Sequence, residues 1–565
     1  MEPLKIVIAS ATLDTAKFVK FFEQDRYITP GNPGNSGKNP KKQVPVFVVS
    51  GRMFPVEVFY TPPVYTDELY ELIAKKVEDI HLSQRQGDIL VFLPGQNEIM
   101  LTMQAIEHKG LRGLKCLPLF SKLSMEEQTS IFAPHPGKRH VIVSTNIAET
   151  SVTIPGITTV IDTGLARMTD FDYSTGIGSL TVQKISQSSA IQREGRAGRV
   201  EPGVCYRLYS REDFERREFH TPPEIQRSDL ADVVLQMILM ELPNIEHFDF
   251  VDPPEFEAFQ QAFQTLRTLG AIDKKRQITD LGMKMAYLPL DTRISRMLLA
   301  ARRYNCVEEV AVIASFLSVK NPFLRPVGEE EEADNALKYF QRLGMGREDF
   351  ESGKQRPKNK RERRTKPYAS DLLTYLSAWK KVFMIEDETT RKQYCDSHYL
   401  NALAFEEAKL IYEQLMETLV EFGGQEFAMY LENHGSMLKN ENLLRPLSDQ
   451  KREGIIKSIA SGQIQNLCQR NRFGNYSSQK ADRITIHPGS MFFNRQPLLI
   501  IATEIMETTK IFARNITEIN PDWLPEIAPH FHFEKRHQPN PRRNTFFTKH
   551  NRRGGYRGRR SYRRR

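Results

Sequence analysis

The sequence has few cysteines and no long hydrophobic run, and each absence excludes a class of protein. The five cysteines among 565 residues are scattered and form no C-x-x-C pair. This spacing argues against a zinc site and a disulfide framework, and it fits a reducing compartment. No run of about 18 or more apolar residues occurs, so the sequence predicts no transmembrane helix and no membrane partner. The length predicts several domains.

The positive charge is confined to one end of the chain. The whole sequence has a net charge of +9, but residues 534–565 contain 13 Lys and Arg residues and one acidic residue. The rest of the chain is therefore slightly acidic. Arginine, glycine and tyrosine alternate at 553–558, which is typical of a disordered arm that binds a polyanion such as nucleic acid. The alternative is a tail that serves only solubility.

Short apolar runs alternate with helical stretches in the first part of the chain, and this pattern predicts an α/β domain with a parallel sheet. The predicted strands are at 4–10, 46–49, 56–60, 88–93, 140–144 and 158–162. The predicted helices are at 14–23, 66–82 and 97–108. Between 168 and 185 the pattern changes to that of a hairpin with its turn near 174–178.

Helical periodicity dominates after about residue 220. Helices predicted at 227–241 and 255–269, followed by a strand-like piece at 271–279, fit a winged-helix module. Residues 290–423 predict a helical bundle, and short strands between 467 and 533 predict a small barrel. The bundle is interrupted by an acidic run at 329–332 and a basic loop at 354–366. Both fit solvated insertions, and the basic loop fits a nuclear import signal equally well.

The segment 192–199, Gln-Arg-Glu-Gly-Arg-Ala-Gly-Arg, carries the strongest chemical signal. Arg196 and Arg199 are close enough in sequence to reach one phosphate together, and glycine permits a close approach of the backbone. Arginine placed at developing phosphoryl charge stabilises it during transfer. A second segment, 144–151, follows a predicted strand with hydroxyl and amide side chains, where open α/β sheets bind ligands.

Together these motifs resemble those of the DEAH-box (DEAH/RHA) family of ATP-dependent RNA helicases. In that family's order, 10–12 resembles motif III, 92–99 motif IV, 144–151 motif V and 192–199 motif VI. Residues 223–227 and 269–273 are similar to its winged helix, and 486–490 and 523–529 to its C-terminal OB-fold. The resemblance is greatest to the eukaryotic branch that remodels spliceosomal and ribosomal RNA–protein complexes.

The resemblance implies an α/β RecA-like domain followed by a winged helix, an α-helical ratchet bundle and a β-barrel OB-fold. The implied boundaries are 1–44 for a remnant of a first RecA-like domain, 45–215 for the second, 220–289 for the winged helix, 290–425 for the ratchet, 430–533 for the OB-fold and 534–565 for a disordered Arg-rich tail.

The resemblance also implies a nucleotide site. Gln192, Arg196 and Arg199 are the implied catalytic residues, at the γ-phosphate and the attacking water. Phe132 is expected to stack on the base and Thr153 to lie near the ribose. Pro155 departs from the family pattern, which often has an aspartate aimed at the ribose. A proline side chain makes no hydrogen bond there, so nucleotide selectivity is expected to differ.

An RNA site is implied at two places. Thr145 and Asn146 are expected to hold the RNA backbone, together with Ser121 and Lys122, where the family usually has Gly-Ser. Lys122 would add a phosphate contact.

Two other pairs complete the implied machinery. Ser10 and Thr12 are expected to couple the nucleotide state to the grip on RNA. In the OB-fold, the segment from His487 to Ser490 is expected near the RNA exit, and the alternative for His487 is an ordinary turn residue.

Two family motifs do not occur in this sequence. There is no Gly-x-x-x-x-Gly-Lys-Ser/Thr P-loop and no Asp-Glu-x-His box. We therefore expect the isolated chain not to hydrolyse ATP, because the phosphate cradle and the magnesium ligands are missing. A fragment, an alternative isoform or a misplaced start codon would explain the absence.

The expected function is an ATP-dependent RNA helicase that remodels RNA or RNA–protein complexes in splicing, other mRNA processing or ribosome assembly. ATP and Mg²⁺ are the implied cofactors, and single-stranded RNA, RNA–protein complexes and a glycine-rich activator protein are the implied partners. The alternatives are a non-catalytic RNA- or partner-binding protein and a different nucleotide-using α/β enzyme. The expected location is the nucleus, with the nucleolus or cytoplasm as alternatives.

Overall fold

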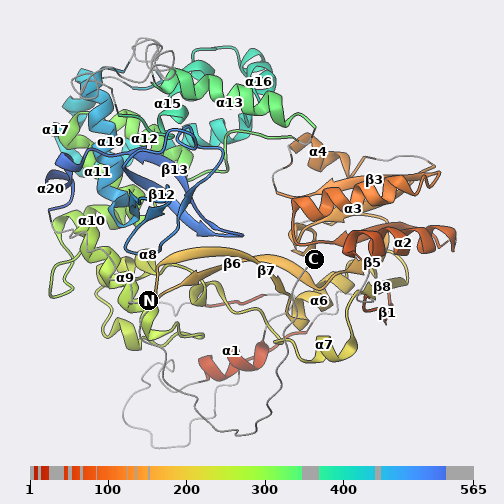
Figure 1. The fold of residues 1–565 in the computed structure, drawn as a ribbon. Helices are drawn as coiled ribbons and strands as arrows, with labels where there is room; N and C mark the ends of the chain where they lie inside the picture. The colour runs from red at the N-terminus through yellow and green to blue at the C-terminus, as the bar shows by residue number, and fades with distance from the viewer. Residues whose placement is uncertain are drawn as a thin grey trace, which may run out of the picture. The chain divides into compact units, whose positions relative to one another are not determined.

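A parallel α/β sheet is followed by helical modules and a second, mixed sheet (Figure 1). The computed structural model describes residues 5–9, 14–23, 44–48, 54–63, 68–83, 85–121, 123, 125–133, 137–150, 153–326, 328–345, 368–434, 436–438 and 447–529. The predicted Arg-rich tail at 534–565, the basic loop at 354–366, Ser10, Thr12 and Lys122 lie outside these residues. Within the described ranges, no helix is both long and apolar enough to cross a membrane.

The first sheet has six parallel strands in the order β1-β8-β5-β2-β4-β3. Their bounds are Val56–Tyr60 (β1), Asp88–Phe92 (β2), Leu114–Leu119 (β3), Arg139–Ser144 (β4), Ile157–Asp162 (β5) and Gly203–Arg207 (β8). The central strands β2, β4 and β5 are buried along nearly their whole length, as expected of strands covered on both faces of a parallel sheet.

The alternation of side chains along β2 fixes the two faces of this sheet. Ile89 and Val91 pack with the buried faces of α2 (Leu69–Leu82) and α3 (Gln96–His108), which lie side by side (Figure 1). Leu90 and Phe92 point to the other face, into a separate apolar cluster. The carboxyl ends of the strands therefore form an edge that is held from both sides.

Two predicted strands are wrong over the residues that the structure describes. Residues 5–9, within the strand predicted at 4–10, have no strand partner, and Ile6, Val7 and Ile8 are exposed. Residues 44–48 of the strand predicted at 46–49 are also unpaired. An apolar run forms a strand only where another strand supplies hydrogen bonds, and none does so here. The helix predicted at 14–23 is confirmed as α1 (Thr15–Phe22), whereas β3 and β8 were missed.

The predicted hairpin is confirmed as β6 (Leu165–Asp172) and β7 (Ile177–Lys184), with a turn slightly earlier than expected. Asp172 accepts hydrogen bonds from the backbone and hydroxyl of Ser174 and the hydroxyl of Thr175, which closes the turn. Beyond the turn, β7 pairs with the second sheet, through Gly178 opposite Met506. The hairpin thus connects the α/β sheet to the C-terminal part of the chain (Figure 1).

The winged-helix pattern is borne out by three helices around one core. These are α8 (Ala231–Leu239), α9 (Phe256–Leu269) and α10 (Asp280–Tyr287), and an antiparallel bridge between Ile272 and Ile278 forms a minimal wing. The ring of Tyr173 from the hairpin turn packs against this core. The ammonium of Lys480, from the barrel, donates to the carbonyl of Gly176 in the same turn at 3.1 Å.

The helical bundle surrounds α12 (Val307–Leu317), which is buried over almost its whole length. Its other helices are α11 (Thr292–Ala301), α13 (Glu330–Met345), α15 (Leu373–Phe383), α16 (Glu388–Ser397), α17 (Ala402–His434) and α19 (Asp449–Gln463). The acidic run forms the first turn of α13, where carboxylates interact favourably with the helix dipole. The bundle was predicted to end at 425 and the OB-fold to begin at 430. Helix α17 continues without a break through this interval.

The predicted barrel is a sheet in the order β10-β9-β12-β13-β11, joined by β7. Its strands are β9 (Leu467–Arg470), β10 (Tyr476–Ser477), β11 (Thr485–Ile486), β12 (Leu499–Glu507) and β13 (Ile511–Glu518). These strands lie within the interval 467–533, in which the sequence predicts short strands.

A buried carboxylate joins the bundle to this sheet. Asp371, just before α15, accepts hydrogen bonds from the Ser490 hydroxyl at 2.6 Å and from the backbone N–H groups of Met491 at 3.0 Å and Ile516 at 2.8 Å. Its neighbour Ser370 bridges to Thr517 of β13. Burial raises the pKa of Asp371 to about 6, although the three hydrogen bonds oppose the shift.

Asp371→Asn is expected to change how stability depends on pH. An aspartate in an unfolded chain has a pKa of about 4, so the folded state binds the extra proton between there and about 6. This contribution to the unfolding free energy is present at low pH and is lost as the pH rises through 6. The stability of Asp371→Asn relative to the wild type should therefore increase over this interval. Urea unfolding followed by tryptophan fluorescence measures it.

Ser490→Ala is the matched control, because it removes one donor and leaves the carboxyl in place. It is expected to keep the direction of the wild-type pH dependence and to make it steeper, because one of the hydrogen bonds that oppose the rise in the pKa of Asp371 is lost. Parallel stability curves for the wild type and Asp371→Asn between about pH 4 and 7 would contradict the raised pKa.

Candidate functional site

The carboxyl ends of β2 and β4 bring the motif segments 92–99 and 144–151 to one edge of the parallel sheet, beside the end of β5. Phe92, Ser144 and Asp162 are the last residues of these strands. The motif helix α6 (Gln187–Glu194) begins above this edge, where the Ser186 hydroxyl accepts a hydrogen bond from the Ser189 N–H at 3.2 Å. Open α/β sheets bind ligands at this edge, so the fold puts the expected site in a usual place.

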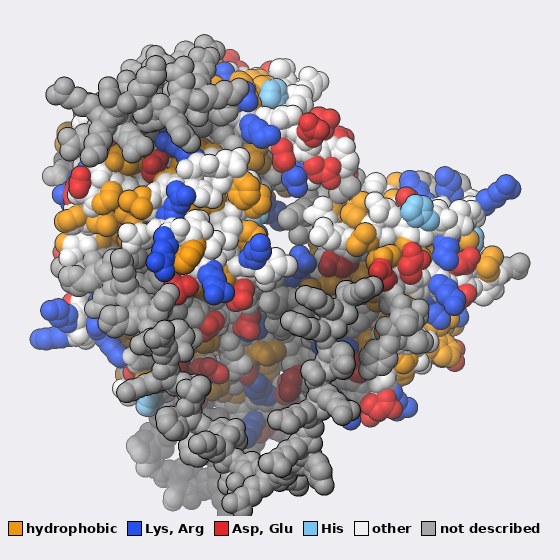
Figure 2. Space-filling model, viewed as in Figure 1, with side chains coloured by type: hydrophobic (Ala, Val, Ile, Leu, Met, Phe, Trp, Pro, Cys, Tyr) orange, Lys and Arg blue, Asp and Glu red, His pale blue; other side chains and the backbone are white. Residues whose placement is uncertain are grey.

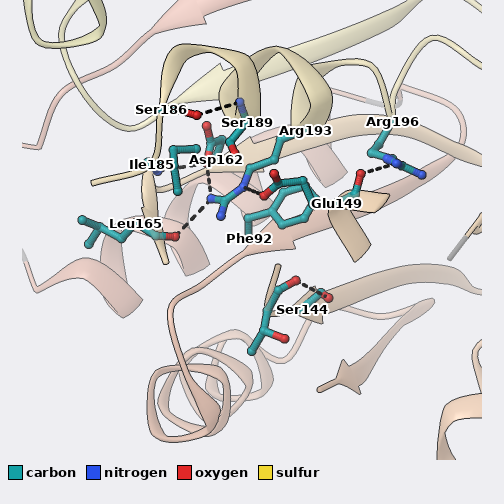
Figure 3. A network of polar contacts seen from close by, with 12 residues as sticks. Phe92, Ser144, Glu149, Asp162, Leu165, Ile185, Ser186, Ser189, Arg193 and Arg196 are labelled. Carbon is teal, nitrogen blue, oxygen red and sulfur yellow. Dashed lines mark hydrogen bonds and ion pairs between the residues drawn. The ribbon is translucent and has the colours of Figure 1, made fainter. Parts of the chain in front are cut away.

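Arg193 is the centre of the site, and its side chain is completely buried (Figure 3). Its guanidinium donates to Asp162 at 2.8 Å, to Glu149 at 3.1 Å and to the carbonyl of Leu165 at 3.1 Å. It also lies over the ring of Phe92, 4.7 Å from the ring centre. One side chain thus joins the end of β2, the end of β5, the short helix α5 (Ile147–Thr150) and α6.

The charges of this network are balanced by further partners. The Tyr209 hydroxyl donates to the other oxygen of Asp162 at 2.8 Å, and Glu194 pairs with Arg207 at 3.0 Å. Burial lowers the pKa of Arg193, but Asp162 and Glu149 outweigh it and the net shift is upward. Arg193 therefore stays charged, and the buried carboxylates stay paired.

Arg196 and Arg199 leave this core and approach each other at the surface. The Arg196 guanidinium donates to the backbone carbonyl of Glu149, and Arg199 donates to the Thr153 hydroxyl at 2.6 Å. Together with Leu90, Ala148 and Ile154 they line a shallow depression. Burial, and next the nearby Arg199, lower the pKa of Arg196. Two guanidinium groups that repel each other favour an anion between them.

Of the other predicted nucleotide residues, Thr153 adjoins this depression through its hydrogen bond from Arg199. Gln192 is half-buried on α6, next to Arg193. Phe132 is 45% exposed and follows Ile131, which packs in the same apolar cluster as Ile154. Pro155 is exposed beside Ile154. At Gly198 an added Cβ would lie 2.7 Å from the carbonyl oxygen of Phe54, so this glycine permits close packing within the chain, and the predicted approach of glycine backbone to a phosphate stays a prediction.

Three of the predicted RNA residues are neighbours on adjacent strands. Leu119 of β3 lies opposite Ser144 of β4, and the Thr145 N–H donates to the Leu119 carbonyl at 3.0 Å. The exposed Ser121 and Asn146 follow these strand ends directly. Thr145 and Asn146 lie about one helical turn before Glu149. The segment 145–149, which leads into α5, therefore contains both predicted RNA residues and a partner of Arg193.

The two OB-fold residues are in a turn with internal hydrogen bonds. The Gly489 N–H donates to His487 Nδ1 at 3.2 Å, and the His487 ring contacts Phe512. Ser490 donates to Asp371, which gives its hydroxyl a structural partner.

The sequence analysis missed Arg193, Glu149 and Asp162 as members of the site. A signal for Arg193 was present, since it stands inside the motif at 192–199. Arg193 lies in the last turn of α6, whereas Arg196 follows the end of this helix at Glu194, so the two arginines take different environments.

Arg193→Met is expected to lower the unfolding free energy by roughly 3–5 kcal/mol, because it leaves Asp162 and Glu149 buried without their cation. Arg199→Met is the control, since it removes one exposed contact with Thr153 and is expected to cost about 1 kcal/mol or less. Thermal unfolding of both variants beside the wild type measures the difference. Equal shifts for the two variants would exclude a special role for Arg193.

Four family models match successive parts of the chain. They are the helicase conserved C-terminal domain at 68–201, the winged-helix and ratchet-like helicase associated domains at 262–290 and 291–375, and the oligonucleotide/oligosaccharide-binding fold at 455–531.

Two solved structures of Escherichia coli HrpB share the fold. One, a DExH-box NTPase, has a TM-score of 0.58 and 23% identity, and the match covers 85% of this chain and 48% of that one. The other, a DEAH/RHA helicase, has a TM-score of 0.57 at 23% identity, with 84% and 48% covered.

Curated relatives match nearly the whole chain. The ATP-dependent RNA helicase HrpA homolog of Haemophilus influenzae is 34% identical over 93% of this chain, and HrpA of Escherichia coli is 33% identical over 93%. The chain spans only 36% and 37% of these two proteins. Probable ATP-dependent RNA helicase DHX35 of Pongo abelii is 32% identical over 94% of this chain, which spans 67% of it. The chain belongs to the DEAH-box family of RNA helicases.

Proposed function

We propose that the protein is an ATP-dependent RNA helicase in which this chain supplies the grip on RNA and the arginine side of the ATP site. One observation carries the proposal. Arg196 donates to the backbone carbonyl of Glu149, about one helical turn after Thr145 and Asn146, and Arg196 and Arg199 line a depression together with Ala148 of the same short helix α5. The two expected ligands would therefore bind on either side of one short helix, α5.

The chemistry of the arginine side fits a triphosphate. Arg196 and Arg199 would bind the transferred phosphate and stabilise the charge that develops on it. Gln192 would orient the attacking water, Thr153 would lie near the ribose, and Phe132 would stack on the base. Arg193 would hold α6 and the Glu149 turn in place, so that the two outer arginines keep their positions without touching the phosphate.

Magnesium does not fit the described residues, which include no group of three His, Cys, Asp or Glu side chains able to hold a metal ion. The sequence also has no P-loop lysine and no acidic box. In this family enzyme, the metal ligands and the phosphate cradle would come from residues outside this sequence. Gln192, Arg196 and Arg199 would close the site from the opposite side.

RNA would be recognised mainly through its backbone. Thr145, Asn146 and Ser121 present hydroxyl and amide groups at neighbouring strand ends, and such groups contact phosphates and sugars without reading bases. Asn146→Ala should therefore weaken binding to all sequences to a similar extent.

The cellular setting follows from the resemblance to the eukaryotic branch. We propose a nuclear protein that remodels RNA–protein complexes in mRNA processing or ribosome assembly, with a glycine-rich activator protein as a partner. The basic segments at 354–366 and 534–565 support nuclear import and RNA contact, respectively.

The test measures ATP hydrolysis and RNA binding on the same purified 565-residue chain. We expect the chain to bind single-stranded RNA, with an affinity that falls as salt increases, and to show no RNA-stimulated hydrolysis in the presence of Mg²⁺. Asn146→Ala is expected to weaken RNA binding about fivefold, which corresponds to about 1 kcal/mol for one lost hydrogen bond.

Arg199→Ala is the control for this test. It should leave RNA affinity unchanged, since its partner Thr153 belongs to the nucleotide side. Robust magnesium-dependent hydrolysis by the wild-type chain would contradict the assignment of the phosphate cradle to other residues. Failure of the wild-type chain to bind RNA would instead favour a protein-binding role.

A further inference from the structure

A tight turn between β9 and β10 presents an aromatic ring to solvent. The Asn471 side chain accepts hydrogen bonds from the N–H groups of Phe473 at 2.9 Å and Asn475 at 3.2 Å. Gly474 completes the turn with a φ of +86°, which a side chain would strain. Phe473 at the tip is 76% exposed, and the Arg472 guanidinium lies 4.9 Å from its ring centre. Single exposed apolar residues are common, but the turn holds this ring at a fixed position with its surface open to solvent.

A second loop, 493–498, is attached to this turn. The Tyr476 hydroxyl donates to the Pro497 carbonyl at 2.6 Å, and Arg470 donates through its backbone to Leu498 at 2.8 Å and through its side chain to the Gln496 carbonyl at 3.1 Å. Phe493 is 41% exposed and Leu498 is 63% exposed. The two loops therefore form one fixed surface with exposed apolar groups from both, which we name the aromatic platform (residues 470–475 and 493–498).

The charge of the aromatic platform selects the kind of partner. It contains Arg470, Arg472 and Arg495 and no acidic residue. Arg495 also pairs with Glu518 of β13 at 3.4 Å. Figure 2 shows basic side chains among apolar ones over the area in which Figure 1 draws β12 and β13. Arginines interleaved with exposed aromatic rings match single-stranded nucleic acid, whose bases stack on rings while its phosphates pair with guanidinium groups.

The aromatic platform continues the expected RNA path. The segment His487–Ser490, predicted near the RNA exit, leads directly into it, since the Phe493 N–H donates to the Ser490 carbonyl at 3.1 Å. The platform lies at the start of β12, whereas the hairpin strand β7 pairs at the other end, through Met506 and Glu507. A strand rises about 3.3 Å per residue, so the length of β12 separates the platform from the hairpin by several nucleotides of RNA.

We infer that the aromatic platform is a second RNA-binding site, on which bases of single-stranded RNA stack after the strand passes His487–Ser490. The inference rests on the proposed function and extends it, because it assigns a role to Phe473, Phe493 and Arg472 in lengthening the RNA footprint. Stacking on a ring is tolerant of sequence, so the platform adds affinity rather than base specificity.

The test compares the binding of fluorescein-labelled oligouridylates of increasing length, from about 4 to about 16 nucleotides, to the purified chain. The RNA affinity of Phe473→Ala is expected to stop rising once the oligonucleotide reaches a certain length. The affinity of the wild type is expected to keep rising at greater lengths. The variant should bind the longest oligonucleotide roughly 10-fold more weakly and the shortest equally well, because one stacked base contributes about 1–3 kcal/mol.

Three variants serve as controls. Phe473→Trp keeps an aromatic face and should restore long-oligonucleotide binding, whereas Phe473→Leu keeps apolar area and should not. Phe256→Ala removes a ring that is 54% exposed at the start of α9, and it should behave as the wild type. Arg472→Glu should weaken the binding of long oligonucleotides and reduce its salt dependence.

The outcomes separate this inference from the proposed function. If the wild-type chain binds no oligouridylate at any length, the proposed function fails and the platform fails with it. If the wild type binds but Phe473→Ala has the same length dependence, only the platform is excluded. An equal loss at short and long lengths would also overturn it, since that result places Phe473 in the primary site.

Discussion

The ion pairs of Arg193 are the constraint on which the rest of the site depends. A fully buried guanidinium is tolerated only because Asp162, Glu149 and the Leu165 carbonyl accept its hydrogen bonds and Phe92 covers its face. These partners come from separate strands and helices. Their positions are therefore fixed relative to one another to within the tolerance of a hydrogen bond, and removing the arginine would leave two carboxylates buried without a cation.

This constraint fixes the position of α5, which lies next to both of the proposed ligand surfaces. Glu149 accepts from Arg193 through its side chain and from Arg196 through its backbone, so the turn that follows Thr145 and Asn146 also positions an arginine of the phosphate site. The hairpin and Asp371 connect the winged helix, bundle and barrel in a similar way, through few polar contacts at the junctions.

Much of the architecture could be predicted from the sequence, because buried parallel strands and helix periodicity leave direct marks on it. The strands β2, β4, β5, β12 and β13 and the helices α2, α3 and α9 appear where the pattern indicates them. The runs at 4–10 and 46–49 have equally apolar residues but no described partner strand, and pairing is not encoded within a single run.

The candidate site could be predicted only in part. The motif at 192–199 identified Arg196 and Arg199, but burial of Arg193 depends on Glu149 and Asp162, which are distant in sequence. Ser490 illustrates the same limit, since its acceptor Asp371 lies in another module. The contacts that decide a residue's role are made in three dimensions between segments whose spacing carries no sequence pattern.

The most direct test of the central claim is the coupling energy between Arg193 and Asp162. It is obtained from the opening free energies that amide hydrogen exchange reports for β5 and α6 in the wild type, Arg193→Met, Asp162→Asn and the double variant. The account predicts that the double variant loses clearly less stability than the sum of the two single losses, by about 2 kcal/mol or more, because it leaves no unpaired partner. Additive losses would show that the two side chains act independently and that Arg193 does not organise the site.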